Sequence, residues 1–283
     1  MEITKLFFYF TVVVIATISG FNNVAAQESN EITTERLTYH QHNNSAKSQS
    51  MTVYRMASRN ENNKAPAILF FHGGGWVTGA PIQFRRQAEI LAQRGMVVAN
   101  VEYPLDGDPI KATRIAQTAL CWFRQNAALF NIDLRKIAVS GGSAGGQIAV
   151  ASALTDWKSN PACKNTEGVL ANAIILFNPV LDMKGKWESK FNTNLQTVSP
   201  IDLLTQSLPP TLILQGDSDK VTPLKIVETF VSKAKDVGSP NVNLRIYKGE
   251  GHGFFNRRKF DATTADVVNF FESLGWIKRE KTR

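Results

Sequence analysis

The sequence predicts an α/β fold, a mostly parallel, doubly wound sheet flanked by helices, with a short cap excursion. Short apolar runs alternate with longer amphipathic segments from Pro66 to the end of the chain, as in parallel sheets covered by helices. Several of these runs stop abruptly at glycines, which mark strand-to-helix turns. The 283 residues suit one domain of this class with an ample core.

Composition excludes several other classes of protein. Hydrophobic residues make up 43% and charged residues 20% of the chain, which indicates neither disorder nor a membrane bundle. The net charge of +8 comes partly from basic clusters at 257–259 and in the C-terminal tail, which we interpret as solvated faces. No nucleic-acid-binding motif is present, so we expect no nucleic-acid partner.

The N-terminus has the pattern of a secretory signal peptide. Lys5 precedes an apolar run over 6–18. The small residues that end at Ala26 are of the kind that signal peptidase prefers before its cleavage site. The run is shorter than the ~20 residues that a membrane span needs, which disfavours the alternative of an uncleaved anchor. We therefore expect residues 1–26 to be a signal peptide cleaved after Ala26, leaving a secreted or periplasmic protein with no stable membrane insertion.

Two cysteines are present, Cys121 in a helical pattern and Cys163 in a loop. Export to an oxidising compartment permits one disulfide between them. Their spacing alone does not place them within bonding distance, so two unpaired thiols remain the alternative.

Residues 27–283 are expected to form a single catalytic domain, with the following strands and helices. Two strand-like runs in a polar stretch predict an edge hairpin over 36–40 and 51–56. Further strands are expected at 67–71, 96–101, 136–140, 171–177, 211–215 and 242–247. Helices are expected at 83–94, 112–129, 144–154, 224–235 and 261–274. One long excursion, 178–209, separates two of the strands and forms the cap.

The strongest local signal is a G-x-S-x-G motif centred on Ser143, between a strand and a helical segment. A serine on such a tight turn is forced into an unfavourable backbone region, and side chains two residues away would collide. Gly141 and Gly145 occupy those two positions. The alternative, a phosphate-binding loop, is disfavoured because no Gly-Lys-Ser/Thr follows.

A nucleophilic serine needs a histidine as base and a carboxylic acid to orient that histidine. Where the serine lies on such a strand-to-helix turn, the acid follows it in the sequence and the histidine comes last. His252 is the only histidine C-terminal to Ser143, and it comes directly after the last strand. Asp217 and Asp219 both follow the strand at 211–215. One of them would orient the imidazole, and the other would cap the turn. Spacing does not separate the two.

Donors for a tetrahedral oxyanion are expected in the triple glycine that follows the first core strand. Gly74 and Gly75 are the candidates, together with the backbone N–H of Ala144. His72 is interpreted as a structural residue of this loop because it precedes the nucleophile in sequence. Trp76 has two open interpretations, lining the pocket or packing.

The HGGGW segment at 72–76 and the GxSAGG elbow at 141–146 resemble the α/β-hydrolase superfamily, specifically the bacterial esterases similar to hormone-sensitive lipase. The likeness covers residues 66–274. In that group the acid is the aspartate three residues after the glycine that ends its strand, which implies Asp219. The same resemblance implies Gly74, Gly75 and Ala144 as the oxyanion donors. The chain departs from many relatives in having glycine before the serine and a short N-terminal cap.

The expected function is a serine esterase with no metal and no cofactor, acting through an acyl-enzyme on short-acyl esters. The pattern also resembles exported esterases that remove acetyl or feruloyl groups from carbohydrates. The charged excursion, with Trp187 and Phe191 as its few apolar anchors, favours polar substrates over long acyl chains. The alternatives are a serine peptidase or lipase of the same fold, or a catalytically silent binding protein.

Overall fold

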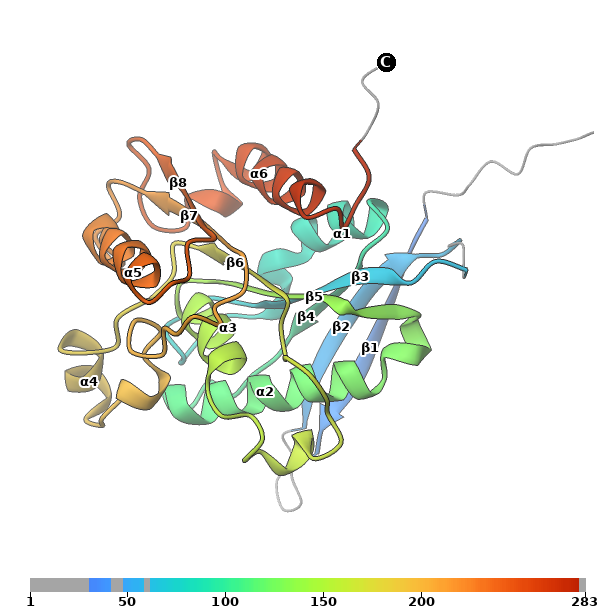
Figure 1. The fold of residues 1–283 in the computed structure, drawn as a ribbon, viewed down its shortest axis with the longest axis horizontal. Coiled ribbons are helices and arrows are strands. Elements are labelled where there is room, and N and C mark those ends of the chain that lie inside the picture. Colours follow the sequence, from blue (N-terminus) through green and yellow to red (C-terminus); the bar gives the residue numbers. More distant parts are fainter. Residues whose placement is uncertain (1–30, 42–47, 59–61, 280–283) are drawn as a thin grey trace, which may run out of the picture.

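A computed structural model describes residues 31–41, 48–58 and 62–279 and contains one eight-stranded sheet (Figure 1). The strand order is β1-β2-β4-β3-β5-β6-β7-β8; β1 and β2 form an antiparallel hairpin, β2 pairs antiparallel with β4, and all other pairings are parallel. The strands are β1 (Ile32–His40), β2 (Gln49–Met56), β3 (Ala65–Phe71), β4 (Val97–Val101), β5 (Ile132–Gly142), β6 (Ala173–Phe177), β7 (Thr211–Gly216) and β8 (Val242–Tyr247). The expected signal peptide lies outside the described residues.

Helices cover both faces of the sheet, which confirms the doubly wound prediction (Figure 1). The α-helices are α1 (Arg85–Gln93), α2 (Pro109–Gln125), α3 (Ala144–Leu154), α4 (Lys186–Phe191), α5 (Leu224–Asp236) and α6 (Phe260–Ser273). Buried residues of α2, α3 and α5 belong to one core cluster, and those of α1 and α6 belong to the other. None of the helices in the described part of the chain is long and apolar enough to cross a bilayer.

Strand β3 shows why the central strands have continuous apolar sequences. Leu69 and Phe71 point into the cluster under α2 and α3, whereas Ile68 and Phe70 point into the cluster under α1 and α6. All four are at most 1% exposed. A strand buried on both faces gains from apolar side chains at every position, so the sequence run is not alternating.

Several elements differ in extent from the sequence prediction, and two of them show the physical reason. Helix α2 begins at Pro109 instead of residue 112, because Asp108 caps it by accepting from the N–H groups of Ile110 and Lys111. Pro109 suits the first helical position, whereas the sequence pattern alone places it in the preceding turn. Strand β5 begins four residues early, at Ile132, because that residue pairs with Ala65 of β3.

The expectation that the excursion 178–209 has few apolar anchors is wrong. Eight of its apolar side chains are buried in the core under α2, α3 and α5: Val180, Leu181, Met183, Leu195, Val198, Ile201, Leu204 and Leu208. The sequence pattern does not indicate their burial, because they lie in a segment without helix or strand periodicity, apart from the short α4. The excursion therefore contributes to the domain core as well as covering the site.

The two cysteines form a disulfide. Cys121 lies in α2 and Cys163 in the segment between α3 and β6, with their Cα atoms 5.1 Å apart. This distance is within the usual range for a disulfide. The bridge ties that connecting segment to α2, and both residues are almost fully buried.

Candidate active site

Three side chains from separate loops meet at the carboxyl ends of β5, β7 and β8. Ser143 follows β5, Asp219 follows β7 and His252 follows β8. His252 Nε2 lies 3.0 Å from Ser143 Oγ, and its Nδ1 lies 2.8 Å from Asp219 Oδ2. The imidazole thus bridges the serine hydroxyl and the carboxylate, an arrangement suited to activating a nucleophile.

The turn that carries Ser143 is strained, as the motif predicts. Its φ is 55°, in a region that a residue with a side chain rarely adopts. A Cβ at Gly141 would lie 2.2 Å from the Gly145 carbonyl oxygen, and one at Gly145 would lie 2.0 Å from the Phe71 carbonyl oxygen. Helix α3 begins at Ala144, so the serine sits directly before a helix N-terminus.

The structure separates the two aspartates. Asp219 has a fully buried side chain and contacts His252, while Asp217 is exposed and accepts the N–H of Gly249 at 2.7 Å. Only Asp219 is therefore placed to orient the imidazole. Asp217 instead holds two loops together.

Hydrogen bonds keep Asp219 ionised despite its burial. Burial raises the pKa of this carboxyl, but the hydrogen bonds from His252 and Thr222 outweigh it and hold the pKa below its usual range. Thr222 donates its N–H to Oδ1 at 3.0 Å and its hydroxyl to Oδ2 at 2.8 Å. A second N–H, from Val221, reaches Oδ1 at 2.8 Å.

The triple-glycine loop leaves two of its N–H groups available beside Ser143. The N–H of Gly73 is occupied, because it donates to Gln83 Oε1 at 2.6 Å. Gly74 and Gly75 have φ values of 132° and 61°, which only glycine adopts readily. Within the residues described, no acceptor is found for their N–H groups or for that of Ala144. These three are the donors that the sequence and the resemblance point to.

His72 and Trp76 flank the glycines, and both side chains are packed in the interior of the protein. His72 is 1% exposed and stacks on Tyr103 with ring centroids 4.4 Å apart, and its Nδ1 donates to the Gly73 carbonyl. Burial lowers the pKa of His72. Trp76 is fully buried and donates its indole N–H to Gln147 at 2.9 Å, which favours the packing interpretation.

The sequence analysis did not identify the residues that position Ser143, Asp219 and His252. Thr222 could have been found from the Asp-x-x-Thr spacing, in which an Asp side chain accepts the backbone N–H three residues on. Asn178, directly after β6, accepts the N–H of Gly253 through Oδ1, and its carbonyl oxygen lies 3.3 Å from the Thr222 hydroxyl. It thereby joins the loop of His252 to the loop of Asp219.

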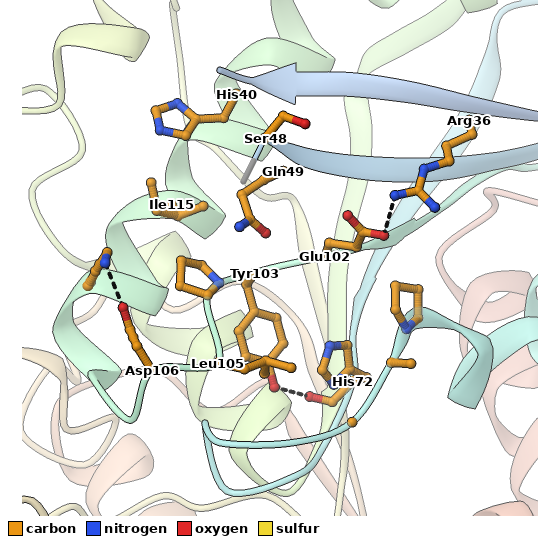
Figure 2. A pocket seen from close by; sticks show the side chains of 15 residues that line it. Arg36, His40, Ser48, Gln49, His72, Glu102, Tyr103, Leu105, Asp106 and Ile115 are labelled. Carbon is orange, nitrogen blue, oxygen red and sulfur yellow. Dashed lines mark hydrogen bonds and ion pairs between the residues drawn. The ribbon is translucent and has the colours of Figure 1, made fainter. Parts of the chain in front are cut away.

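A cavity of about 690 Å³ adjoins this site at His72 and Gly79, and the three catalytic candidates do not line it (Figure 2). It lies against the β1–β2 hairpin. Its charged side chains are paired with one another, Arg36 with Glu102 at 2.8 Å and Lys111 with Asp106. Across the described ranges, no group of three or more His, Cys, Asp or Glu side chains is arranged to hold a metal ion.

Comparison with known proteins gives one consistent family. The BD-FAE family model matches residues 51–190. Esterase LipC of Mycobacterium tuberculosis is 28% identical over 67% of this chain, and the match spans 53% of LipC, so the chain spans about half the length of that relative. An esterase from Thermogutta terrifontis, solved with butyrate bound, is 31% identical over 88% of this chain and 96% of its own, with a TM-score of 0.80.

The chain belongs to the α/β-hydrolase superfamily, in its group of esterases similar to hormone-sensitive lipase. The eight-stranded sheet, the glycine loop and the serine turn agree with this assignment. The Thermogutta esterase has also been solved phosphoramylated by tabun, with 30% identity and a TM-score of 0.77.

Proposed function

We propose that this protein is a serine carboxylic ester hydrolase that works through an acyl-enzyme. The observation that carries the proposal is the continuous contact from Ser143 through His252 to Asp219, at 3.0 and 2.8 Å. A serine hydroxyl is a weak nucleophile unless a base takes its proton, and the imidazole is within reach to do so.

The geometry supports a two-step reaction. Ser143 Oγ attacks the ester carbonyl while His252 Nε2 accepts its proton, and Asp219 stabilises the resulting imidazolium. The negative oxygen is held by the N–H groups of Gly74, Gly75 and Ala144. His252 then protonates the leaving alcohol, and a water molecule, deprotonated by the same imidazole, hydrolyses the acyl-enzyme.

Short acyl groups are the proposed substrates. The Thermogutta esterase has been solved with butyrate and with propionate bound, and each match covers 88% of this chain at 31% identity. Its adducts with tabun, sarin and paraoxon support a reactive nucleophile in the relative. We extend both features to this chain.

Carbohydrate esters bearing acetyl or feruloyl groups are the proposed natural class, and export is proposed with them. Trp187 and Phe191 are only partly buried and lie beside the glycine loop, where an aromatic ring can stack on a sugar. The Cys121–Cys163 disulfide supports an oxidising compartment. Hydrolysis rates on acetylated xylan, methyl ferulate and tributyrin test the substrate class, and preference for tributyrin would favour a lipase.

Labelling by a fluorophosphonate probe tests the activity itself. We expect the wild-type protein to be labelled and the Ser143→Ala variant to be unlabelled, because the probe reacts with an activated serine. An unlabelled wild-type protein with an intact fold would favour a silent binding protein on a hydrolase scaffold.

A further inference from the structure

A lysine of the cap lies against the glycine loop. Lys190 is in α4, and its ammonium nitrogen would be 3.4 Å from a Cβ built on Gly75. Apart from Gly75 itself and its two neighbours in the chain, no other atom comes within 4 Å of that position, so the space there is otherwise open. The N–H of Gly75 is one of the proposed oxyanion donors. The Lys190 ammonium therefore lies beside a glycine whose N–H is a proposed oxyanion donor.

Aromatic contacts hold α4 in this position. The Trp76 ring contacts the rings of Trp187 at 5.1 Å and Phe191 at 5.5 Å, both edge to face. Lys190 Nζ lies 5.5 Å from the Trp187 ring and 4.9 Å from the Phe191 ring. Because Trp76 is fully buried and anchored to Gln147, the helix rests on a rigid part of the oxyanion loop.

The acidic groups of the excursion are all engaged elsewhere. Glu188 accepts the N–H of Leu195, Asp182 accepts the N–H of Lys184, and Asp202 pairs with the Lys184 ammonium at 2.9 Å. In the described part of the chain, Lys190 forms no ion pair. Its ammonium is exposed, with two aromatic rings as its protein contacts, and is therefore accessible to a ligand.

We infer that, among the carbohydrate esters proposed above, the preferred substrates carry a carboxylate or a comparable anionic group close to the scissile ester, and that Lys190 binds that group. The inference rests on the proposed esterase function and specifies the substrate class of the same site. An anionic group bound there would displace water from the exposed Lys190 ammonium and form a charge-assisted hydrogen bond with it. The net charge of +8 would also attract such esters from solution.

Two matched pairs of esters test this inference, one on each side of the scissile bond. The acyl-side pair is the mono-4-nitrophenyl ester of glutaric acid and its neutral primary amide. The alcohol-side pair is 4-acetoxybenzoate and 4-acetoxybenzamide. In each pair the two compounds have nearly the same size, so the ratio of their kcat/KM values reports the effect of the negative charge.

The variants are Lys190→Met, Lys190→Arg and Lys186→Met. Lys186 is the matched control, since its ammonium lies 4.8 Å from the same Trp187 ring but is absent from the space beside Gly75. For at least one pair, we expect Lys190→Met to lower the ratio of anionic to neutral kcat/KM by about 5- to 10-fold at low salt. Lys190→Arg should retain most of the ratio and Lys186→Met should retain it fully. Added salt should lower the wild-type ratio.

Two outcomes would overturn the inference. One is a ratio that Lys190→Met leaves unchanged for both pairs; if both kcat/KM values fall together, Lys190 acts in oxyanion stabilisation or in the fold. The other is an equal fall of the ratio in Lys186→Met. Hydrolysis of the neutral esters by the wild type and its loss in Ser143→Ala test the proposed function separately.

Discussion

At the scale of single residues, Asp217 and Asp219 show how neighbouring carboxylates acquire different roles. They are two positions apart, yet one is exposed on a loop and the other has a fully buried side chain. Burial without partners would favour the neutral acid, so the hydrogen bonds from Thr222 and His252 are what keep Asp219 charged. A charged Asp219 can then stabilise the imidazolium that forms during the reaction.

Replacing each aspartate by asparagine should therefore give very different results. Asp219→Asn should lower kcat by about 10⁴-fold, because an amide favours the wrong imidazole tautomer and cannot balance its positive charge. Asp217→Asn is the matched control and should change kcat little, since its contact is with the Gly249 backbone. Steady-state kinetics on 4-nitrophenyl acetate measure both. Similar losses would contradict the assignment of Asp219.

Removal of the nucleophile should abolish hydrolysis while leaving the fold intact. Ser143→Ala deletes one hydroxyl at a partly exposed position, so unfolding by urea should change little. In contrast, kcat should fall by about 10⁶-fold, because the three residues act as one unit. A variant that keeps a tenth of the activity would refute Ser143 as the nucleophile.

The sequence predicts the three side chains that meet at the candidate site but not the residues that hold them in place. Ser143 was identified by its local motif, and His252 by being the only histidine after it. The resemblance selected Asp219. Asn178 was missed because its partners, Thr222 and Gly253, are 44 and 75 residues away. Contacts at such separations arise only when the sheet brings the loops together.

At the scale of elements, the serine turn depends on close backbone approach between β3 and α3. A Cβ at Gly145 would meet the Phe71 carbonyl oxygen at 2.0 Å, and backbone cannot move away as a flexible side chain can. We expect Gly145→Ala to lower the free energy of unfolding by roughly 3 kcal/mol and to remove most activity. Urea titration and kinetics measure the two effects.

Gly251 provides the control for that experiment. It precedes His252, and the nearest atom to a Cβ built there is 3.9 Å away. Gly251→Ala should therefore retain stability close to that of the wild type. If Gly145→Ala were equally stable, the close packing of α3 against the end of β3 would be contradicted.

The disulfide links two elements separated by 42 residues. In the chain-entropy account, closing a loop of this length in the unfolded state stabilises the fold by about 4 kcal/mol. Reduction with dithiothreitol should therefore lower the urea midpoint of the wild type. The variant with both cysteines replaced by alanine should have a low midpoint that no longer responds to dithiothreitol. A wild-type midpoint insensitive to the reductant under unfolding conditions would contradict a stabilising role.

At the scale of the whole molecule, periodicity predicted the fold well where elements are regular. Helix α3 and strand β8 have the predicted bounds, because each is a run of uniform pattern between clear turns. The excursion was less predictable, since its eight buried apolar residues follow no period and become visible only when packed. Its contribution to the core therefore depends on the tertiary structure.

The packing of the excursion also bears on which acyl chains the enzyme accepts. A long-chain lipase needs a broad apolar surface or tunnel beside its nucleophile. Here the buried apolar side chains of the excursion are already in the domain core, and Lys190 borders the open space beside Gly75. We expect higher kcat/KM values for the acetyl and butyryl 4-nitrophenyl esters than for the palmitoyl ester. All three should be measured in one detergent below its critical micelle concentration, with Ser143→Ala as the blank. Preference for the palmitoyl ester would mean that the excursion opens an apolar channel, and a lipase assignment would then replace the short-acyl proposal.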